Sequence, residues 1–353
     1  MDSALLHAET HSESVARATP AEFSALEHYL TPVRRFLDLD VTEVCINRPG
    51  EVWTESIHGW ERHDVPELTF SALQMLSNLS ANATGQEISA RNPVISAHLP
   101  SQERMQIVMP PATTPGCVSM TIRKPSVRRF TMDTYAAQGF FDTVTVQQGG
   151  IRDHEVELKN LLKANEIRRF LEVAVKSRAT ILVSGATGSG KTSFMKMLVD
   201  MIASEERLIT VEDTPELSLE NQPNHVRLFY SKGGRGASAV KAGDLIESAM
   251  RMKPERILLA EVRDDAAYYF IGAANTGHPG SITSVHANSE RDAFGRMAYL
   301  LRGAEAAKSM GDDVTRQLIL QTVDVVVHIG KINGKRAVTG IYYEPERKYS
   351  DLG

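Results

Sequence analysis

Apolar positions in the first part of the chain recur with two different periods. Helical spacing predicts amphipathic helices over residues 23–38 and 69–83. Short β-like runs bounded by turn residues predict strands, at 41–46, 51–55, 104–109 and 118–123. The turn Arg48-Pro49-Gly50 joins the first two runs into a hairpin. This mixture of helices and strands predicts an α+β domain over residues 21–125.

From about residue 156 the pattern changes to a regular alternation of strands and helices. Short apolar runs predict strands, at 180–184, 208–212, 226–230, 256–262 and 281–286. Helical spacing lies between and before them, at 161–178, 191–203, 242–252 and 264–275. Such alternation is typical of a mostly parallel sheet covered by helices. Near the end, two β-like runs around Asn333-Gly334 predict a hairpin over 325–342.

Two segments lack a clear period. Residues 1–20 carry acidic side chains and no basic start followed by an apolar core, so we expect a flexible tail rather than a secretory signal. Residues 126–155 are weakly periodic and contain Gly149-Gly150, which predicts a linker between domains. The second domain is therefore expected over residues 156–353.

Composition narrows the classes of protein. Hydrophobic residues make up 42% and charged residues 24% of the 353 positions, as in folded proteins with real cores. The formal net charge of −5 disfavours duplex DNA as the main partner. Cys45 and Cys117 form no CxxC pair, which favours a reducing, cytoplasmic setting without a cysteine-bound metal. No apolar run approaches the roughly 18–20 residues of a membrane span, so we expect any membrane contact to be peripheral.

One short motif carries a strong chemical signal. Residues 185–192 match GxxxxGK[ST], a pattern that chance produces on the order of once per hundred chains of this length. The motif directly follows the predicted strand 180–184 and opens a predicted helix, as a phosphate-binding loop requires. The alternative is a glycine-rich loop that merely turns the chain. The flanking elements favour the phosphate loop.

The chemistry of this loop predicts ATP and Mg²⁺ as ligands. Glycines let successive backbone N–H groups point at phosphate oxygens, and the helix amino terminus adds partial positive charge. Lys191 supplies a full charge for the β- and γ-phosphates, and the Thr192 hydroxyl is suited to Mg²⁺. The predicted nucleotide-binding residues of the loop are Gly185, Ala186, Thr187, Gly188, Ser189, Gly190, Lys191, Thr192 and Ser193.

Two acidic residues follow predicted strands of the same domain. Glu212 ends the run 208–212, and Glu261 follows a run that resembles a Walker B segment. Hydrolysis needs a group that holds the metal and a group that orients the attacking water. We expect Glu261 to support the metal and Glu212 to polarise the water, although the sequence leaves open which of the two activates it. The alternative is that both are solvated acids at strand ends.

Histidines and arginines offer weaker signals. His278 and His286 flank a predicted strand, and zinc binding is disfavoured because no other ligand cluster accompanies them. His286 is either polar surface or a group that hydrogen-bonds near the γ-phosphate and senses its loss. ATPases that work as rings often complete a site with an arginine from elsewhere. The sequence does not rank the candidates, which are Arg104, Arg123, Arg227, Arg235, Arg251 and Arg263.

Four motifs occur in one order along the chain, at residues 185–192, 209–215, 251–264 and 276–288. This series resembles the Walker A, Asp-box, Walker B and His-box motifs of the secretion ATPase superfamily, which serves type II and type IV secretion and type IV pili. Upstream, residues 44–53 and 119–124 resemble the amino-terminal domain of the type IV secretion branch.

The resemblance implies an α/β fold with a RecA-like ATPase domain and a smaller, PAS-like amino-terminal α+β domain. It further implies a homohexameric ring at the cytoplasmic face of the inner membrane, with ATP between the two domains. In that arrangement Arg123 would reach the nucleotide, Glu212 and Glu261 would serve the chemistry, and His286 would belong to the sensing box. Ala260 stands where the family commonly has glycine. The four-cysteine metal module of many type II members is missing, which argues against that branch.

The main hypothesis is therefore an ATPase that energises type IV secretion, exporting substrate or assembling a pilus. Its expected partners are further copies of itself, inner-membrane components of the system, and a protein or protein–DNA cargo. A pilus-retraction or type II secretion ATPase shares the chemistry and stays an alternative. A DNA-dependent RecA-like motor is disfavoured by the acidic balance. An ABC subunit is disfavoured because no LSGGQ-like segment is present, and Glu212 with Glu261 argues against a non-catalytic scaffold.

Overall fold

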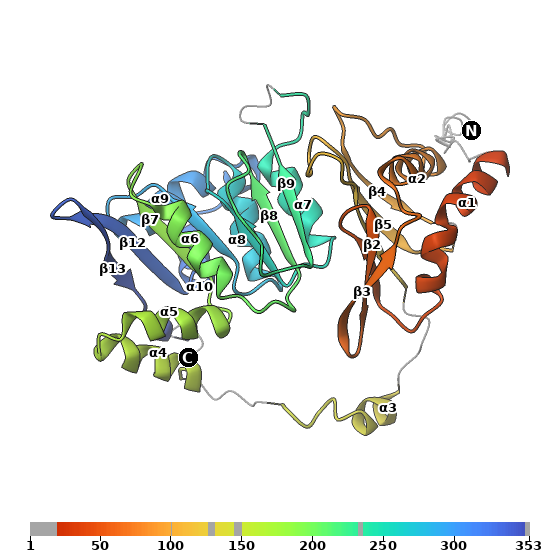
Figure 1. Ribbon diagram of the computed structural model, residues 1–353. Coiled ribbons are helices and arrows are strands. Elements are labelled where there is room, and N and C mark those ends of the chain that lie inside the picture. The colour runs from red at the N-terminus through yellow and green to blue at the C-terminus, as the bar shows by residue number, and fades with distance from the viewer. Residues whose placement is uncertain (1–19, 100, 126–130, 145–149, 232–235, 350–353) are drawn as a thin grey trace, which may run out of the picture.

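The computed structural model describes residues 20–99, 101–125, 131–144, 150–231 and 236–349. These residues form two sheets, each with its own helices, and the chain between the sheets carries one short helix (Figure 1). Arg235, one of the candidate arginines, lies outside the described residues. No helix among the described residues is long and apolar enough to cross a membrane.

The first sheet has six strands in the order β3-β2-β1-β6-β5-β4, and every neighbouring pair is antiparallel. Its strands are β1 (Glu43–Ile46), β2 (Gly50–Ser56), β3 (Gly59–Val65), β4 (Val94–His98), β5 (Arg104–Val108) and β6 (Ser119–Arg123). Helices α1 (Pro20–Leu37) and α2 (Phe70–Ala83) cover one face. The edge strands β3 and β4 are absent from the sequence prediction, and β3 is mostly exposed and polar, so an apolar pattern does not reveal it.

Alternation along the strands gives the first sheet two different faces. Met120 and Ile122 of β6 join the apolar cluster beneath α1 and α2. Thr121, which points to the opposite face because side chains alternate along a strand, contacts Arg207 of the second domain. Gln106 of β5 likewise donates to the Ser248 hydroxyl across the boundary at 2.9 Å. The polar face of this sheet is therefore the face that meets the second domain.

The second sheet has seven strands in the order β13-β12-β7-β11-β10-β8-β9, parallel except for the β12–β13 hairpin. Its strands are β7 (Ile181–Gly185), β8 (Leu208–Glu212), β9 (His225–Phe229), β10 (Arg256–Leu259), β11 (Ile282–Val285), β12 (Val325–Ile332) and β13 (Lys335–Tyr342). Its helices are α4 (Asp153–Lys163), α5 (Ile167–Lys176), α6 (Lys191–Asp200), α7 (Ala242–Met250), α8 (Ala266–Asn275), α9 (Asp292–Leu301) and α10 (Asp312–Thr322). The predicted parallel sheet and its terminal hairpin are confirmed.

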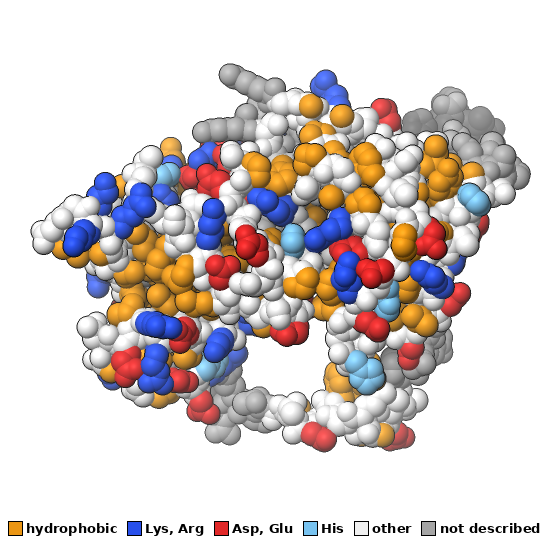
Figure 2. Space-filling model, viewed as in Figure 1, with side chains coloured by type: hydrophobic (Ala, Val, Ile, Leu, Met, Phe, Trp, Pro, Cys, Tyr) orange, Lys and Arg blue, Asp and Glu red, His pale blue; other side chains and the backbone are white. Residues whose placement is uncertain are grey.

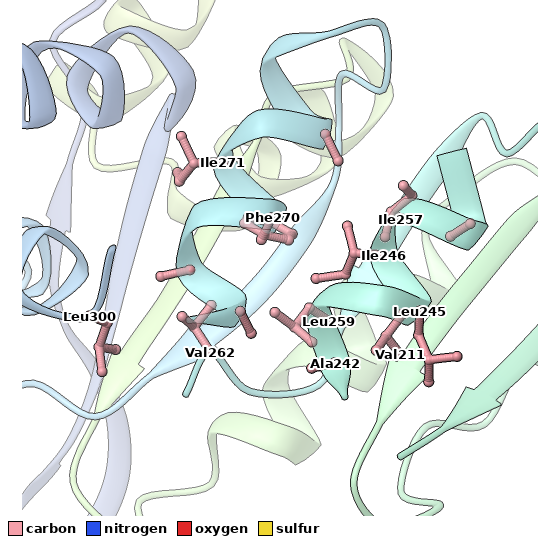
Figure 3. Close-up of a cluster of buried hydrophobic side chains, with 14 of the residues drawn as sticks. Val211, Ala242, Leu245, Ile246, Ile257, Leu259, Val262, Phe270, Ile271 and Leu300 are labelled. Atoms are coloured by element: carbon pink, nitrogen blue, oxygen red, sulfur yellow. The ribbon is translucent and has the colours of Figure 1, made fainter. Parts of the chain in front are cut away.

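Two apolar clusters bury the two faces of this sheet. Figure 3 shows part of one cluster, in which Leu245 and Ile246 of α7 and Phe270 of α8 pack with Val211 and Leu259 of the strands. The strand residues alternate between the clusters: Leu182 of β7 belongs to this one, whereas its neighbours Ile181 and Val183 belong to the other. Burial on both faces explains why these strands read as continuous apolar runs in the sequence.

The prediction was wrong in three places within this domain. The predicted helix 161–178 is two helices, because Asn165 between α4 and α5 adopts a left-handed conformation with φ of 58°. Helix α4 begins at Asp153, inside the predicted linker. Helices α9 and α10 were not predicted, although Ala293, Met297 and Leu300 of α9 are buried at helical spacing.

The described part of the segment between the domains, residues 131–144, runs clear of both sheets (Figure 1). Its helix α3 (Met132–Ala137) buries no residue. Among the described residues, contact between the domains is therefore made by the two folded domains rather than by residues 131–144.

Arg207, which precedes β8, is fully buried at this contact. Its guanidinium donates to the Met252 carbonyl at 3.0 Å and to Asn47 Oδ1 and Asn224 Oδ1 at 2.7 and 2.5 Å. The group also lies 5.5 Å from the centre of the Trp60 ring. Neutral oxygens from both domains thus compensate a buried cation, and the domains must meet for that compensation to exist.

We predict that Arg207→Ala lowers the free energy of unfolding by about 3 kcal/mol, because the buried oxygens of both domains lose their donor. Urea denaturation followed by tryptophan fluorescence measures the loss. The control is Arg168→Ala on α5, whose arginine is 90% exposed in a pair with Glu172 and should contribute no more than about 0.5 kcal/mol. Equal stability of the two variants would contradict the role assigned to Arg207.

Candidate functional site

Four neighbouring strands of the second sheet bring the candidate residues to one edge. The strands β7, β11, β10 and β8 are adjacent and parallel, so their carboxyl ends lie together. Gly185 ends β7, His286 follows β11, Glu261 lies just beyond β10, and Glu212 ends β8. The carboxyl edge of a parallel sheet is where α/β proteins bind ligands.

The loop between β7 and α6 takes its shape from glycine. Gly185 has φ of 155°, and a Cβ there would collide with the Ile329 carbonyl oxygen of β12. Gly190 has φ of 100° and caps the amino terminus of α6 in the left-handed conformation. The loop consequently curls against β12 and delivers Lys191, Thr192 and Ser193 to the first turn of the helix.

Lys191 is the cation of this loop and is 7% exposed. Its Nζ donates to the carbonyl oxygens of Gly185 and Ala186 at 3.0 and 3.1 Å. A third contact joins Nζ to His286 Nδ1 at 3.0 Å. Burial lowers the pKa of Lys191, while the charge of Glu261 opposes that shift. The ammonium group therefore faces the inside of the loop and is held by weak neutral acceptors.

The remaining loop residues form its rim and floor. Ala186, Thr187 and Gly188 are exposed, whereas Ser189 is buried and its hydroxyl has no hydrogen-bond partner among the described residues. A cavity of about 440 Å³ opens beside the loop and is lined by Ala186, Thr187 and His286. The loop thus presents an exposed rim and one unsatisfied hydroxyl.

Glu261 lies in the same group of side chains as Lys191. Its Oε1 is 3.1 Å from His286 Nε2, and its Oε2 accepts from Arg263 at 2.7 Å. Because the Lys191 ammonium can only donate, His286 Nδ1 accepts and the ring proton lies on Nε2, facing Glu261. Burial tends to raise the pKa of Glu261, but the hydrogen bond and charge of Arg263 outweigh it, so that pKa lies below its usual value.

Arg263 extends this group to a fifth residue. Its second branch donates to Asp213 Oδ2 at 2.5 Å, and its contacts with Glu261 and Asp213 raise the pKa of the guanidinium. The side chains therefore form one continuous chain of charged hydrogen bonds from Lys191 through His286, Glu261 and Arg263 to Asp213. Asp213 lies in the motif 209–215, but the sequence assigned it no role, although it directly follows Glu212 at the end of β8.

Glu212 lies apart from that chain and is fully buried. Its Oε1 accepts from the Thr210 hydroxyl and from Arg227 Nε at 2.7 and 3.0 Å. Its Oε2 accepts from Arg227 Nη2 and from the backbone N–H groups of Glu216 and Leu217, at 3.1, 2.8 and 2.8 Å. Five donors occupy about four lone-pair positions, so neither oxygen is free to accept from a water molecule in this arrangement.

Arg123, a predicted site residue, and His278, which was considered only for zinc, lie elsewhere. Arg123 ends β6 of the first sheet, 3.6 Å from Glu43, and no described contact joins it to the phosphate loop of its own chain. His278 precedes β11 and shares a hydrogen bond with the Pro254 carbonyl, at the end of the strand opposite to His286. No group of three or more His, Cys, Asp or Glu side chains among the described residues is placed to hold a metal ion.

The hairpin of β12 and β13 was predicted, but its basic side chains beside the phosphate loop were not. The Cδ of Arg336, at the start of β13, is 3.1 Å from the position of a Cβ on Gly190. Lys331 and Lys335 belong to the same hairpin, and Figure 2 shows Lys and Arg side chains gathered over it. The two segments are far apart in the chain, so no local pattern could have indicated their contact.

Comparison with known proteins assigns the chain to a family. The model of the type II/IV secretion system protein family matches residues 27–331. VirB11 type IV secretion system proteins of Brucella suis and Bartonella quintana are 43% and 42% identical, over 95% and 92% of this chain and 93% and 94% of their own lengths. Protein VirB11 of Rhizobium radiobacter is 36% identical over 86% of this chain and 89% of its own.

A crystal structure of the VirB11 ATPase from the Brucella suis type IV secretion system, in complex with sulphate, superposes with a TM-score of 0.87 at 44% identity. The match covers 92% of this chain and 99% of that one, which confirms the expected RecA-like α/β domain with a smaller amino-terminal domain. The chain therefore belongs to the type II/IV secretion system protein family, within its type IV secretion branch, and is an ATPase.

Proposed function

We propose that this ATPase hydrolyses MgATP at the loop 185–192 and works as a homohexamer that energises type IV secretion. The observation that carries the proposal is the Lys191 ammonium at the amino terminus of α6, joined through His286 to Glu261. An N-terminal helix turn, backbone amides and a cation together suit a triphosphate.

In this proposal the triphosphate replaces the acceptors that Lys191 has in the described structure. The carbonyls of Gly185 and Ala186 are neutral, so phosphate oxygens compete for the ammonium group with a full charge. The orphaned Ser189 hydroxyl, which lacks a partner among the described residues, is a further donor for a phosphate oxygen. Binding thus completes interactions that the loop leaves weak.

Thr192 and Glu261 fit Mg²⁺ because both offer oxygen ligands, which this ion prefers. When bound, the ion neutralises charge on the phosphates. Glu261 stays ionised because its pKa is lowered, and it is the carboxylate joined to the loop cation. We therefore assign Glu261, rather than Glu212, to orienting the attacking water or the metal.

His286 is suited to sensing the nucleotide through Lys191. Its Nδ1 accepts from the ammonium group, and its Nε2 faces Glu261. When Lys191 turns toward phosphate, His286 loses its hydrogen bond at Nδ1 but keeps its contact with Glu261 at Nε2. Loss of the γ-phosphate reverses this change, which gives the sensing role a physical basis.

The position of Arg123 supports a ring. Arg123, Arg104 and Lys124 of the first domain, with Lys253 of the second, line a cavity of about 690 Å³ that no residue of the phosphate loop lines. We propose that the three cations of the first domain meet the nucleotide of a neighbouring subunit. We further propose, from the likeness to type IV secretion proteins, that this ring is peripheral to the cytoplasmic face of the inner membrane and contacts inner-membrane components and a protein or protein–DNA cargo.

The expected result of Lys191→Ala is a loss of ATP hydrolysis of at least about a hundredfold, because the phosphates lose their only loop cation among the described residues. Phosphate release measures the rate, and light scattering measures the oligomer. Lys196→Ala on the same helix is the matched control and should retain both the activity and the hexamer. A wild-type monomer that hydrolyses no ATP would refute the proposed function.

The stability of the first domain is expected to depend on pH through Glu43. Burial raises the pKa of Glu43 from 4.5 to about 7 despite Arg123, so the folded protein binds this proton more tightly than the unfolded chain. The contribution of Glu43 to stability therefore falls as pH rises from 4.5 to 7 and is fully lost above 7. Glu43→Gln should raise the free energy of unfolding at pH 8, by up to about 3 kcal/mol, and change it little at pH 5.

Denaturation at both pH values checks this prediction, with the exposed Glu61→Gln of β3 as control. A stabilisation by Glu43→Gln that is equal at pH 5 and pH 8 would contradict it.

A further inference from the structure

Glu212 occupies a strand end beside the site, yet its oxygens already accept five described hydrogen bonds. A carboxylate so placed can hold other groups in position. Two of the bonds come from the backbone of Glu216 and Leu217, so Glu212 closes the turn that follows β8. That turn carries Asp213, which holds Arg263, which in turn holds Glu261.

Arg227 is the cation that holds Glu212. It lies on β9, the outer strand of the sheet, where its Cα pairs with that of Thr210. Its Nε and Nη2 reach the two oxygens of Glu212 at 3.0 and 3.1 Å, which is the bidentate geometry that arginine forms best. The guanidinium also lies 5.3 Å from the centre of the Phe229 ring. The orientation of the Glu212 carboxylate therefore depends on the placement of β9.

The first domain contacts β9 directly. The Phe229 N–H donates to the Ala112 carbonyl, and the Thr113 hydroxyl donates to the Arg227 carbonyl, both at 2.9 Å. Thr113 pairs with Leu228 as an antiparallel bridge. Ala112 and Thr113 are 0% and 2% exposed, so this addition to the sheet edge is enclosed. Residues of both domains therefore determine where Arg227 lies.

We propose that Arg227 is a positioning residue for hydrolysis, and that docking of residues 112–113 on β9 sets the rate through it. The inference rests on the proposed hydrolysis of ATP. Arg227 orients Glu212, Glu212 orders the turn that carries Asp213, and Asp213 holds Arg263 against Glu261. A displacement of the first domain moves β9 and weakens this series of contacts. The position of the first domain is thereby coupled to turnover, while nucleotide binding at the loop is unaffected.

The experiment measures kcat and KM for MgATP in the full-length protein. Arg227→Gln should lower kcat by about tenfold and leave KM unchanged, because the loop 185–192 is intact. Arg227→Lys should keep the charge but lose the bidentate contact, so its kcat should lie between those of the wild type and Arg227→Gln. The matched control is Lys253→Gln, which removes an interdomain contact with Glu55 and does not touch Glu212.

A double-mutant cycle tests whether Arg227 acts through Glu212. Glu212→Gln and the double variant Arg227→Gln with Glu212→Gln should have the same kcat, since the second change removes nothing that is left. Thr113→Val should lower kcat by about threefold in the wild type and have no effect in Arg227→Gln, whereas Thr113→Ser should retain the wild-type rate. If Arg227→Gln fails to fold, Arg227→Lys replaces it in the cycle.

Unchanged or increased kcat in Arg227→Gln would overturn the proposal, and so would additive effects of the Arg227 and Glu212 substitutions. A fall in kcat that Lys253→Gln reproduces would also overturn it, because loosened docking alone would then explain the result. Failure of the proposed function is a different observation: the wild type itself would show no turnover.

Discussion

The buried ammonium group of Lys191 imposes the main constraint on the ATPase sheet. A cation with little exposure requires compensating acceptors, and the described structure supplies two neutral carbonyls and a histidine nitrogen. Glu261 contributes its charge through His286 and is itself held by Arg263. The same compensation makes the site responsive, because a ligand that offers charged oxygens changes the partners of Lys191 and therefore those of His286.

Two arginines at the domain boundary meet different needs. Arg207 is fully buried among neutral oxygens of both domains, so its contribution is to stability and to the relative placement of the domains. Arg227 is partly exposed and paired with a buried carboxylate beside the site, so its placement bears on chemistry. The first domain contacts both, through Asn47 and through Thr113. Stability and activity are thus connected at one interface through separate residues.

The first domain also carries charge that its own chain leaves weakly compensated. Arg104 and Arg123 stand directly opposite each other on β5 and β6, an arrangement that like charges make unfavourable. Glu43 lies beside Arg123 but is buried, with one oxygen that lacks a partner among the described residues. An incoming anion would relieve the repulsion between the arginines. This repulsion is a physical reason for the proposed ring, in addition to the shapes of the subunits.

Local patterns in the sequence determined the phosphate loop, the parallel sheet and the strand ends that carry Glu212, Glu261 and His286. Those features follow from short-range rules: glycines permit the loop's backbone, and burial of both sheet faces requires continuous apolar strands. The tertiary structure alone decided that Glu212 is occupied by Arg227, that Thr113 contacts β9, and that Arg336 lies over Gly190. These pairs join different elements, and two of them join segments more than a hundred residues apart. A charge or a hydroxyl in a sequence does not specify its partner, because the partner is chosen by how the elements pack.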